Sequence, residues 1–268
     1  AANKFFPRPE SKPSVGLDIG NYACKAVELQ RTANGYQVLN WVKEPVVSGD
    51  KVAAVKRVLT NLNPPAHVAP VTALSGKGTL TRFIEMPKMP IADLKKSFAI
   101  EADKYFPFPL EQIYTDCYNL DPNFKGTKML VLVAAVKKEL VDQRLNFLSD
   151  LGFPGDTITL NAVAVANVMQ ELGGQKPENL SVEQKTVAVG IIDIGEIISN
   201  LTIFVGGIPR FIRDIFIGGR DFTRAISNSL GVNLEEADRL KSNPGDKRPV
   251  LIEACDADGK RFQLVGEG

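Results

Sequence analysis

The sequence predicts a mixed α/β protein built from two related halves, with a compact unit inserted into the first half. The tripeptide Asp-Ile-Gly occurs at residues 18–20 and again at residues 193–195, each time after a short apolar run. Each copy opens a group of three short strands joined by hairpin-length connections. The two aspartates are 175 positions apart, which indicates a duplicated domain rather than a short-period repeat array.

The first half begins with strands and then changes to helical spacing. Strands are expected at 14–19, 24–29 and 36–42, followed by a helix at 51–62, whose apolar residues recur three and four apart, and a strand at 71–74. After the inserted unit, a strand at 157–160 and a helix at 162–172 resume this pattern. Meander, helix and strand together predict one α/β layer.

The inserted unit reads as strand, helix, strand, strand. Its strands are expected at 79–85, 113–120 and 129–136, with helices at 91–105 and 137–151. Four aromatic residues lie in or just after the first of these helices. We expect Phe98 and Tyr105 to be core, and we assign Phe106 and Phe108 in part to a partner-binding groove.

The second half follows a polar, turn-rich linker at 173–185. Strands are expected at 186–194, 198–205 and 209–217, and a hairpin at 250–254 and 261–265. Between them, Gly218 and Gly219 open a helix. Its buried stripe is expected to comprise Phe222, Ala225, Ile226, Ser229 and Leu230.

The composition excludes several classes of protein. Of the 268 residues, 32 are basic and 31 acidic, so no net field would recruit nucleic acid. No apolar run approaches the roughly 20 residues of a membrane helix, so direct membrane insertion is not expected. Cys24, Cys117 and Cys255 lack metal-site or disulfide spacing, which favours a reducing, cytoplasmic setting. His67 is the single histidine, which excludes a Ser-His-Asp triad and a multi-histidine zinc site.

The Asp-Ile-Gly turns have the residue types of a phosphate site. A glycine turn lets a phosphate approach backbone N–H groups, an aspartate before it can hold hydrated Mg²⁺, and a lysine adds a point charge. Asp18, Gly20 and Lys25 fit these three functions. An ordinary hairpin with a polar turn is the alternative for one copy alone, whereas two copies favour a clamp for nucleotide phosphates.

The paired turns, the meanders and the Gly218-Gly219 helix start resemble the actin-like ATPase superfamily. Two longer segments, "RFIEMPKMPIADLKKSFAIEADKYFPFPLEQIYTDCYNL" at 82–120 and "IDIGEIISNLTIFVGGIPRFIRDIFIGGRDFTRAI" at 192–226, are similar to the PilM family of type IV pilus assembly. The similarity extends from about residue 15 to about residue 241. It implies an actin-like, RNase H-like duplicated fold of the FtsA type.

The resemblance also implies a domain plan. Residues 13–78 and 154–180 would form the first actin-like subdomain, 1A, and residues 79–153 the inserted subdomain, 1C. Residues 185–268 would form the second actin-like half, with 2A and the start of 2B. This half is shorter than in the family, so we expect it to be incomplete.

Ligands follow from the resemblance as well. It implies ATP and Mg²⁺ between the two turns, with both aspartates as metal ligands, and the PilN-type inner-membrane protein's cytoplasmic tail in a groove beside the inserted unit. Other pilus assembly proteins, ATPases and self-association are further partners that it admits. The protein would then be cytoplasmic and peripheral to the inner membrane through its partners. The implied cofactor-binding residues are Asp18, Gly20, Asn21, Lys25, Asp193, Gly195, Gly218, Gly219, Asp238 and Lys241.

Three features depart from an active ATPase or leave alternatives open. Glu196 follows the second turn, where relatives carry small hydroxyl residues, and a carboxylate beside phosphates costs Coulomb energy unless a metal intervenes. No catalytic base is identifiable, so we expect no enzyme, or at most a weak ATPase. Asp238 and Lys241 could equally form a solvated i, i+3 ion pair. A small-molecule kinase of the same superfamily, a type II secretion L-type protein and an FtsA-type protein are the alternative functions.

Overall fold

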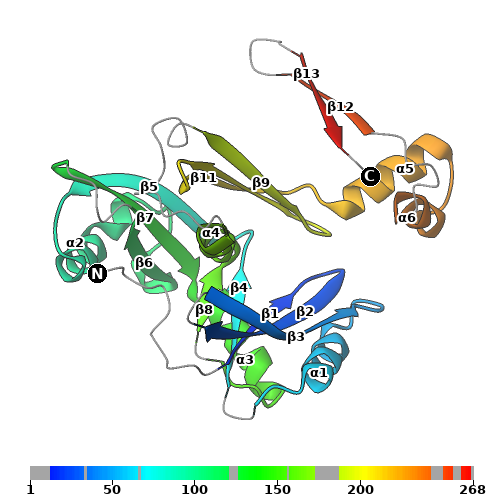
Figure 1. Cartoon of the computed structure of the whole chain (residues 1–268), viewed down its shortest axis with the longest axis horizontal. Coiled ribbons are helices and arrows are strands. Elements are labelled where there is room, and N and C mark those ends of the chain that lie inside the picture. The colour runs from blue at the N-terminus through cyan, green and yellow to red at the C-terminus, as the bar shows by residue number, and fades with distance from the viewer. Residues whose placement is uncertain are drawn as a thin grey trace. The chain divides into compact units, whose positions relative to one another are not determined.

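The computed structural model describes residues 13–32, 35–65, 68–120, 126–155, 157–172, 187–242, 250–255 and 261–266. It divides into two compact units, Ala1–Phe216 and Ile217–Gly268. Figure 1 shows the helices and strands of both units. His67 and the expected linker at 173–185 lie outside the described residues.

A five-stranded sheet organises the first part of the first unit. Its strands lie in the order β3-β2-β1-β4-β8. β1, β2 and β3 are antiparallel, whereas β4 runs parallel to β1 and β8 runs parallel to β4. The predicted meander is confirmed, and the carboxyl ends of β1, β4 and β8 meet at one edge of the sheet. The strands are β1 (Ser14–Ile19), β2 (Ala23–Thr32), β3 (Gly35–Pro45), β4 (Pro70–Leu74) and β8 (Ile158–Leu160).

Helices α1 (Lys51–Leu62) and α3 (Lys138–Asp150) pack against this sheet and bury its apolar face. Asp50 caps α1, because its Oδ1 accepts a hydrogen bond from Ala53 N–H at 2.9 Å. The bounds of α1 are those expected from the apolar spacing. The shared core comprises Val15, Leu17, Cys24, Ala26, Ala54, Val55, Val58, Leu59, Leu62 and Leu148.

The inserted unit is a three-stranded antiparallel sheet in the order β5-β7-β6, with one helix on it. Its elements are β5 (Thr79–Pro87), α2 (Ile91–Glu101), β6 (Ile113–Asn119) and β7 (Lys128–Lys137). The helix expected at 91–105 ends at residue 101 and continues as one 3₁₀ turn, Ala102–Lys104. The buried core under α2 comprises Met86, Leu94, Phe98, Ala102, Phe106, Ile113, Cys117, Met129, Val131, Val133 and Ala135.

The opposite face of this small sheet is also covered. Leu120 and Leu132 are buried together with Ile208 of β11 (Ile208–Ile215), and Val163 of α4 (Asn161–Leu172) packs against them. Two apolar layers therefore enclose the inserted sheet, one of its own and one supplied by the flanking elements. Figure 1 shows β11 and α4 beside β5 and β7.

The second meander repeats the first. β9 (Ala188–Ile194), β10 (Ser199–Val205) and β11 form an antiparallel sheet in the order β11-β10-β9. A shift of 175 residues places β9 on β1 and β10 on β2. The predicted duplication of the meander is thus confirmed.

The second unit contains α5 (Gly219–Leu230), α6 (Leu234–Ser242), β12 (Val250–Cys255) and β13 (Arg261–Gly266). β12 and β13 form the expected antiparallel hairpin. The expected buried stripe of α5 is wrong: Phe222 is 48% and Leu230 62% exposed, whereas Thr223 is buried. Thr223 lies on the side of α5 that contacts α6, so a polar residue occupies the buried position.

No helix among the described residues is long and apolar enough to cross a membrane.

Candidate functional site

The first Asp-Ile-Gly turn joins β1 to β2 and carries a charged pair. Asp18 and Lys25 are register partners, and Lys25 Nζ lies 3.0 Å from Asp18 Oδ2. Both side chains are more than half exposed. Alternation along β1 buries Leu17 against α1 and turns Asp18 to the other face. An exposed pair contributes little to stability, so both groups are available to a charged ligand.

Each turn requires glycine because the backbone closes tightly. A Cβ on Gly20 would lie 2.5 Å from the Ala23 carbonyl oxygen, and one on Gly195 would lie 2.7 Å from the Ile198 oxygen. In the second turn, Gly195 N–H donates to that Ile198 oxygen at 3.1 Å. The two turns therefore share a close approach between the glycine and the residue three positions later.

The second turn differs from the first in charge. Asn200 is the register partner of Asp193, the position that Lys25 holds opposite Asp18. Among the described residues, the exposed Asp193 carboxylate takes part in no ion pair. The lysine of the first turn thus has no counterpart in the second.

The two turn aspartates fit Mg²⁺ better than a metal with a full protein cage. The described residues contain no cluster of three or more His, Cys, Asp or Glu side chains that could hold a metal. Mg²⁺ keeps several waters and needs only one or two carboxylates, often together with substrate phosphates. Asp193, which forms no ion pair with another described residue, and Asp18 are suited to a divalent cation, and Lys25 to a phosphate beside it.

Two partly buried cations add positive charge near the first turn. Arg144 of α3 donates to Thr72 Oγ1 at 2.7 Å and to the next residue's carbonyl oxygen at 3.2 Å. Burial lowers the pKa of Arg144, and Asp18 and Cys24 raise it in part. Burial and the neighbouring Arg144 also lower the pKa of Lys51. This positive field favours an anion at the turn.

Sequence reasoning missed Arg144 and also a polar chain at the edge where β1, β4 and β8 end. That chain comprises Ser75, Gly76, Asn161, Asn200 and Asp214. Its members come from segments far apart in the sequence, so no motif of local spacing predicts that they meet. The available signal was the polar residue directly after two of the parallel strands, Ser75 after β4 and Asn161 after β8, because such strand ends are common ligand positions in α/β sheets.

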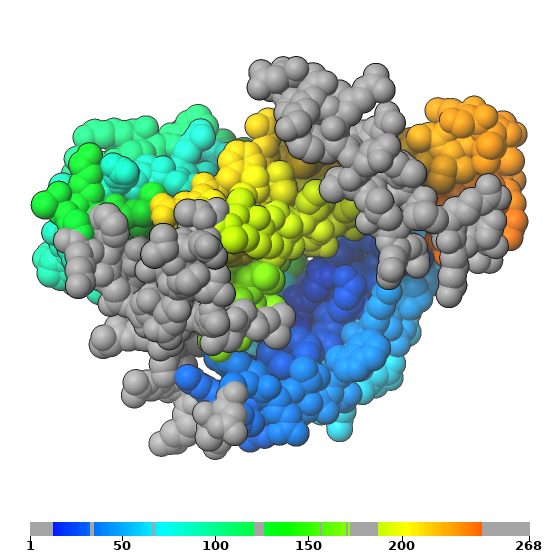
Figure 2. Space-filling model, turned by 45° about the horizontal axis from the view of Figure 1, so that its top comes forward, coloured from blue at the N-terminus to red at the C-terminus, as the bar shows by residue number. Residues whose placement is uncertain are grey.

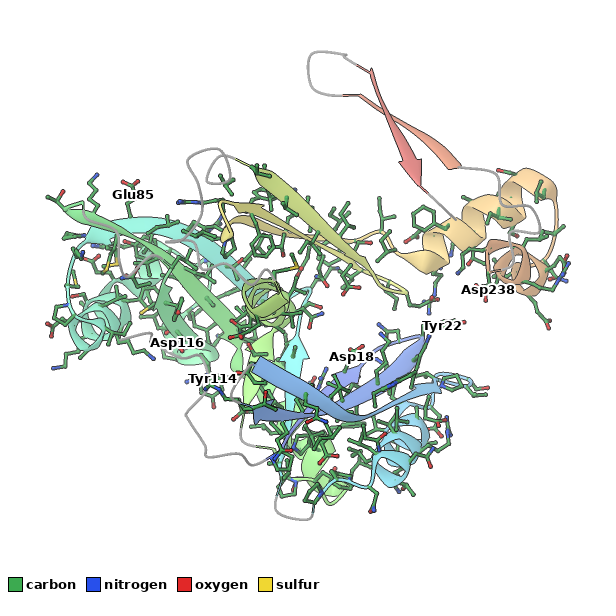
Figure 3. All side chains as sticks on the ribbon, in the orientation of Figure 1. Asp18, Tyr22, Glu85, Tyr114, Asp116 and Asp238 are labelled. Carbon is green, nitrogen blue, oxygen red and sulfur yellow. The ribbon has the colours of Figure 1, made fainter. Side chains whose placement is uncertain are left out.

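The first unit also shows a concave surface between its two meanders. Figure 2 shows the molecular surface hollowed between the blue residues of the first strands and the yellow residues of the second meander. Asp18 lies on β1, and Tyr22 lies in the turn that follows it (Figure 3). Tyr22 is 55% exposed, and Asn21 beside it is exposed as well.

In the second unit, Gly218 and Gly219 open α5. Gly218 N–H donates to Asp221 Oδ2 at 2.9 Å, so a carboxylate already occupies one of the free donors of the helix N-terminus. Gly219 is the first residue of the helix. An anion at this end would compete with the Asp221 carboxylate.

Asp238 and Lys241 form more than a solvated ion pair. Lys241 Nζ lies 2.7 Å from Asp238 Oδ1 and donates to Thr223 Oγ1 at 2.8 Å and to the Gly219 carbonyl oxygen at 3.2 Å. Thr223 Oγ1 lies 3.1 Å from Asp238 Oδ1. The hydrogen bonds from Lys241 and Thr223 hold the pKa of Asp238 below its usual range. Lys241 therefore joins α6 to α5.

The aromatic residues of the inserted unit are chiefly core. Phe98 is 2% and Phe106 4% exposed, and their rings meet edge to face with centroids 6.2 Å apart. Tyr105 packs against the same core. The groove assignment for Phe106 is wrong, because the chain turns inward after the 3₁₀ turn. Phe108 is partly buried, with Lys137 Nζ 5.3 Å from its ring centroid.

Two of the three cysteines behave as small apolar residues. Cys24 and Cys117 are free and buried. Burial raises the pKa of Cys24 and raises the pKa of Cys117 to about 11. Both thiols are therefore protonated and unreactive near neutrality. The side chain of Cys255 lies outside the described part of the chain.

Known proteins match most of the chain. The family described as "Type IV pilus assembly protein PilM" matches residues 16–247. A chain of the "PilM-PilN type IV pilus biogenesis complex" superposes with a TM-score of 0.70 at 25% identity, covering 88% of this chain and 71% of that chain.

Weaker likenesses extend to two further structures. The cytoplasmic domain of EpsL, an inner membrane component of the type II secretion system of Vibrio cholerae, has a TM-score of 0.46 at 10% identity, covering 83% of this chain and 78% of that chain. A protein of unknown function with an actin-like ATPase fold, from Bacteroides thetaiotaomicron, has a TM-score of 0.45 at 10% identity, covering 83% and 79%.

The sheet order with its antiparallel meander and parallel crossover, the inserted unit and the second meander agree with the expected actin-like fold. The family match covers well over half of the sequence. The chain belongs to the type IV pilus assembly protein PilM family.

Proposed function

We propose that this chain is a scaffold of the type IV pilus inner-membrane assembly complex, which binds the cytoplasmic tail of a PilN-type membrane protein. The observation that carries the proposal is the likeness to a chain of the PilM-PilN complex over 88% of this chain. Binding of this tail would hold the chain at the inner membrane through its partner.

We further propose that the two Asp-Ile-Gly turns bind ATP with Mg²⁺ as a conformational switch. Lys25 would contact phosphate oxygens, Asp18 and Asp193 would hold the hydrated metal, and Gly20 and Gly195 would admit the phosphates to the backbone. Mg²⁺, when bound, supplies charge neutralisation for the phosphates. The support is the exposed Asp18–Lys25 pair, the partly buried cations near it and the repeated glycine turn.

Catalysis is at most weak in this proposal. Glu196 would bring a carboxylate toward the phosphates, which opposes charge build-up there. Asn21 stays in the proposed nucleotide site of the first unit. Gly218, Gly219, Asp238 and Lys241 of the second unit remain proposed nucleotide-binding residues, as the family resemblance implies. For Lys241, binding would mean exchanging one of its three present acceptors for a ligand oxygen.

Titration with tail peptides tests the scaffold function. The protein is titrated with a synthetic cytoplasmic tail of a PilN-type protein, with and without Mg-ATP, and with a scrambled peptide of equal composition as control. We expect saturable binding of the native tail alone. Equal binding of both peptides, or no binding in either condition, would contradict the proposal.

Asp18→Ala tests the nucleotide function. We expect Mg-ATP affinity to fall by about tenfold or more, because a metal ligand is lost while the exposed side chain leaves the fold intact. Asp116→Ala is the matched control, since Asp116 also forms an exposed ion pair, with Lys95 Nζ at 2.9 Å. Isothermal titration measures both. Unchanged affinity in Asp18→Ala would remove this turn from the site.

A further inference from the structure

Asp214 of β11 joins elements from both halves of the first unit. Its Oδ2 accepts the backbone N–H of Gly76 at 2.6 Å, and its Oδ1 accepts Asn200 Nδ2 at 2.5 Å. Gly76 is buried and follows the carboxyl end of β4, 138 positions before Asp214. Hydrogen bonds to a carboxylate are about twice as strong as those between neutral groups.

The chain of hydrogen bonds continues to the start of α4. Asn161 Nδ2 donates to Asn200 Oδ1 at 3.3 Å and to Ser75 Oγ at 3.3 Å. Because a carboxylate can only accept, Asp214 fixes which way the Asn200 amide faces, and Asn200 in turn orients Asn161. One carboxylate therefore orders groups at the ends of β4 and β8 and in β10.

Gly76, which Asp214 binds, also lies against the second Asp-Ile-Gly turn. Gly76 has φ +91°, and a Cβ added to it would lie 2.8 Å from Ile198 Cδ1, a side chain of that turn. Asn200 is the register partner of Asp193. Its side chain is 8% exposed, where a lysine such as Lys25 would have to bury its charge.

We propose that Asp214 is the positioning residue that sets the second Asp-Ile-Gly turn against the carboxyl ends of the parallel strands in the first sheet. It does so through the Gly76 amide and through Asn200. The consequence for Mg-ATP rests on the proposed nucleotide function, whereas the positioning of the turn does not.

Moving the carboxylate from residue 214 to residue 200 tests the proposal. Asp214→Asn presents one acceptor where two donors converge, so one hydrogen bond is lost. The double variant Asn200→Asp with Asp214→Asn can keep every bond: the new amide at 214 accepts from Gly76 and donates to the new carboxylate at 200, which still accepts from Asn161. Asp116→Asn, at an exposed position on β6 of the same unit, is the control.

Hydrogen exchange is measured at the Gly76 amide and in the second turn at residues 195–198. We expect exchange about tenfold faster or more in Asp214→Asn at both places, and recovery to within about threefold of wild type in the double variant. A purely local function for Asp214 would change Gly76 alone. Unchanged exchange at residues 195–198, or no recovery in a folded double variant, overturns the proposal.

Mg-ATP titration of the same proteins separates the two proposals. We expect weaker binding in Asp214→Asn and recovery in the double variant. If wild type binds no Mg-ATP, the proposed nucleotide function fails, while the exchange data still decide the function of Asp214. If Asp214→Asn does not fold, the folded double variant with protected Gly76 supports the proposal, and a double variant that also fails to fold overturns it.

Discussion

Asp18 and Asp193 are equivalent residues in the two halves, yet their neighbours differ. Lys25 lies opposite Asp18, whereas Asn200 lies opposite Asp193 and turns to Asp214. The first turn thus carries an exposed ion pair of Asp18 and Lys25. The second carries the exposed Asp193 carboxylate opposite the buried Asn200 amide. Duplication preserved the backbone of the turn, while the two charge arrangements diverged.

Gly20→Ala tests the tight backbone of the first turn. The added Cβ would lie 2.5 Å from the Ala23 carbonyl oxygen, so we expect the free energy of unfolding to fall by about 1–3 kcal/mol. Gly190→Ala in β9 is the control, because a Cβ there meets nothing within 4 Å. Chemical denaturation measures both, and equal stability of the two variants would show that the turn tolerates a side chain.

Among the elements, α2 shows how packing follows the sequence pattern. Leu94 and Phe98 are one turn apart and buried. Ile100, two residues after Phe98 on another face of the helix, is 79% exposed. The helix ends at residue 101, although the apolar spacing continues to Tyr105. Spacing alone could not reveal this end, because the 3₁₀ turn and Phe106 continue into the same core.

Phe98→Ala tests how much this packing contributes to the free energy of unfolding. Removing the ring from the core should lower the free energy of unfolding by about 3–5 kcal/mol. Ile100→Ala on the same helix should change it by less than about 0.5 kcal/mol. Urea denaturation followed by tryptophan fluorescence or circular dichroism measures the difference, and a Phe98→Ala effect as small as the control's would mean that the core adapts.

How far the sequence predicts the molecule depends on whether the signal is local. The meanders, α1 and the hairpin of the second unit follow from alternation, helical spacing and turn residues. The first-turn residues followed from type and spacing within eight positions. Asp214 could not be found in this way, because its bond to Gly76 spans 138 positions. On α5, Phe222 gave an apolar signal, but Thr223 is the buried residue because Asp238 and Lys241 bind its hydroxyl.

At the scale of the whole molecule, the two units can be tested separately. Thr223→Val in the second unit removes the hydroxyl that links Gly219, Asp238 and Lys241. We expect hydrogen exchange to become about tenfold faster in α5 and α6 and to stay unchanged at residues 79–137 of the first unit. Ser229→Ala, at an exposed position of α5, is the control. Faster exchange in both units would show that they unfold together.

The same variant predicts a pH dependence. The pKa of Asp238 is lowered in the folded state, so this carboxylate contributes stability above its ordinary value of 3.8, and the contribution is lost as the pH falls through the folded value. Wild type and Thr223→Val should therefore differ more in exchange at neutral pH than in acid, where the bond from Thr223 to the Asp238 carboxylate no longer contributes. A difference that is equally large after Asp238 is protonated would assign the effect to the other contacts of Thr223, with Gly219 and Lys241.

The two-sided covering of the inserted sheet limits how this subdomain can be moved or replaced. The face of the sheet under α2 is covered by residues of the inserted unit itself. The opposite face is covered by Val163 and Ile208, which follow the unit in the sequence. A graft of residues 79–153 onto another protein would carry an uncovered apolar face that favours aggregation. A graft that keeps this face covered therefore has to carry the segments bearing Val163 and Ile208 as well.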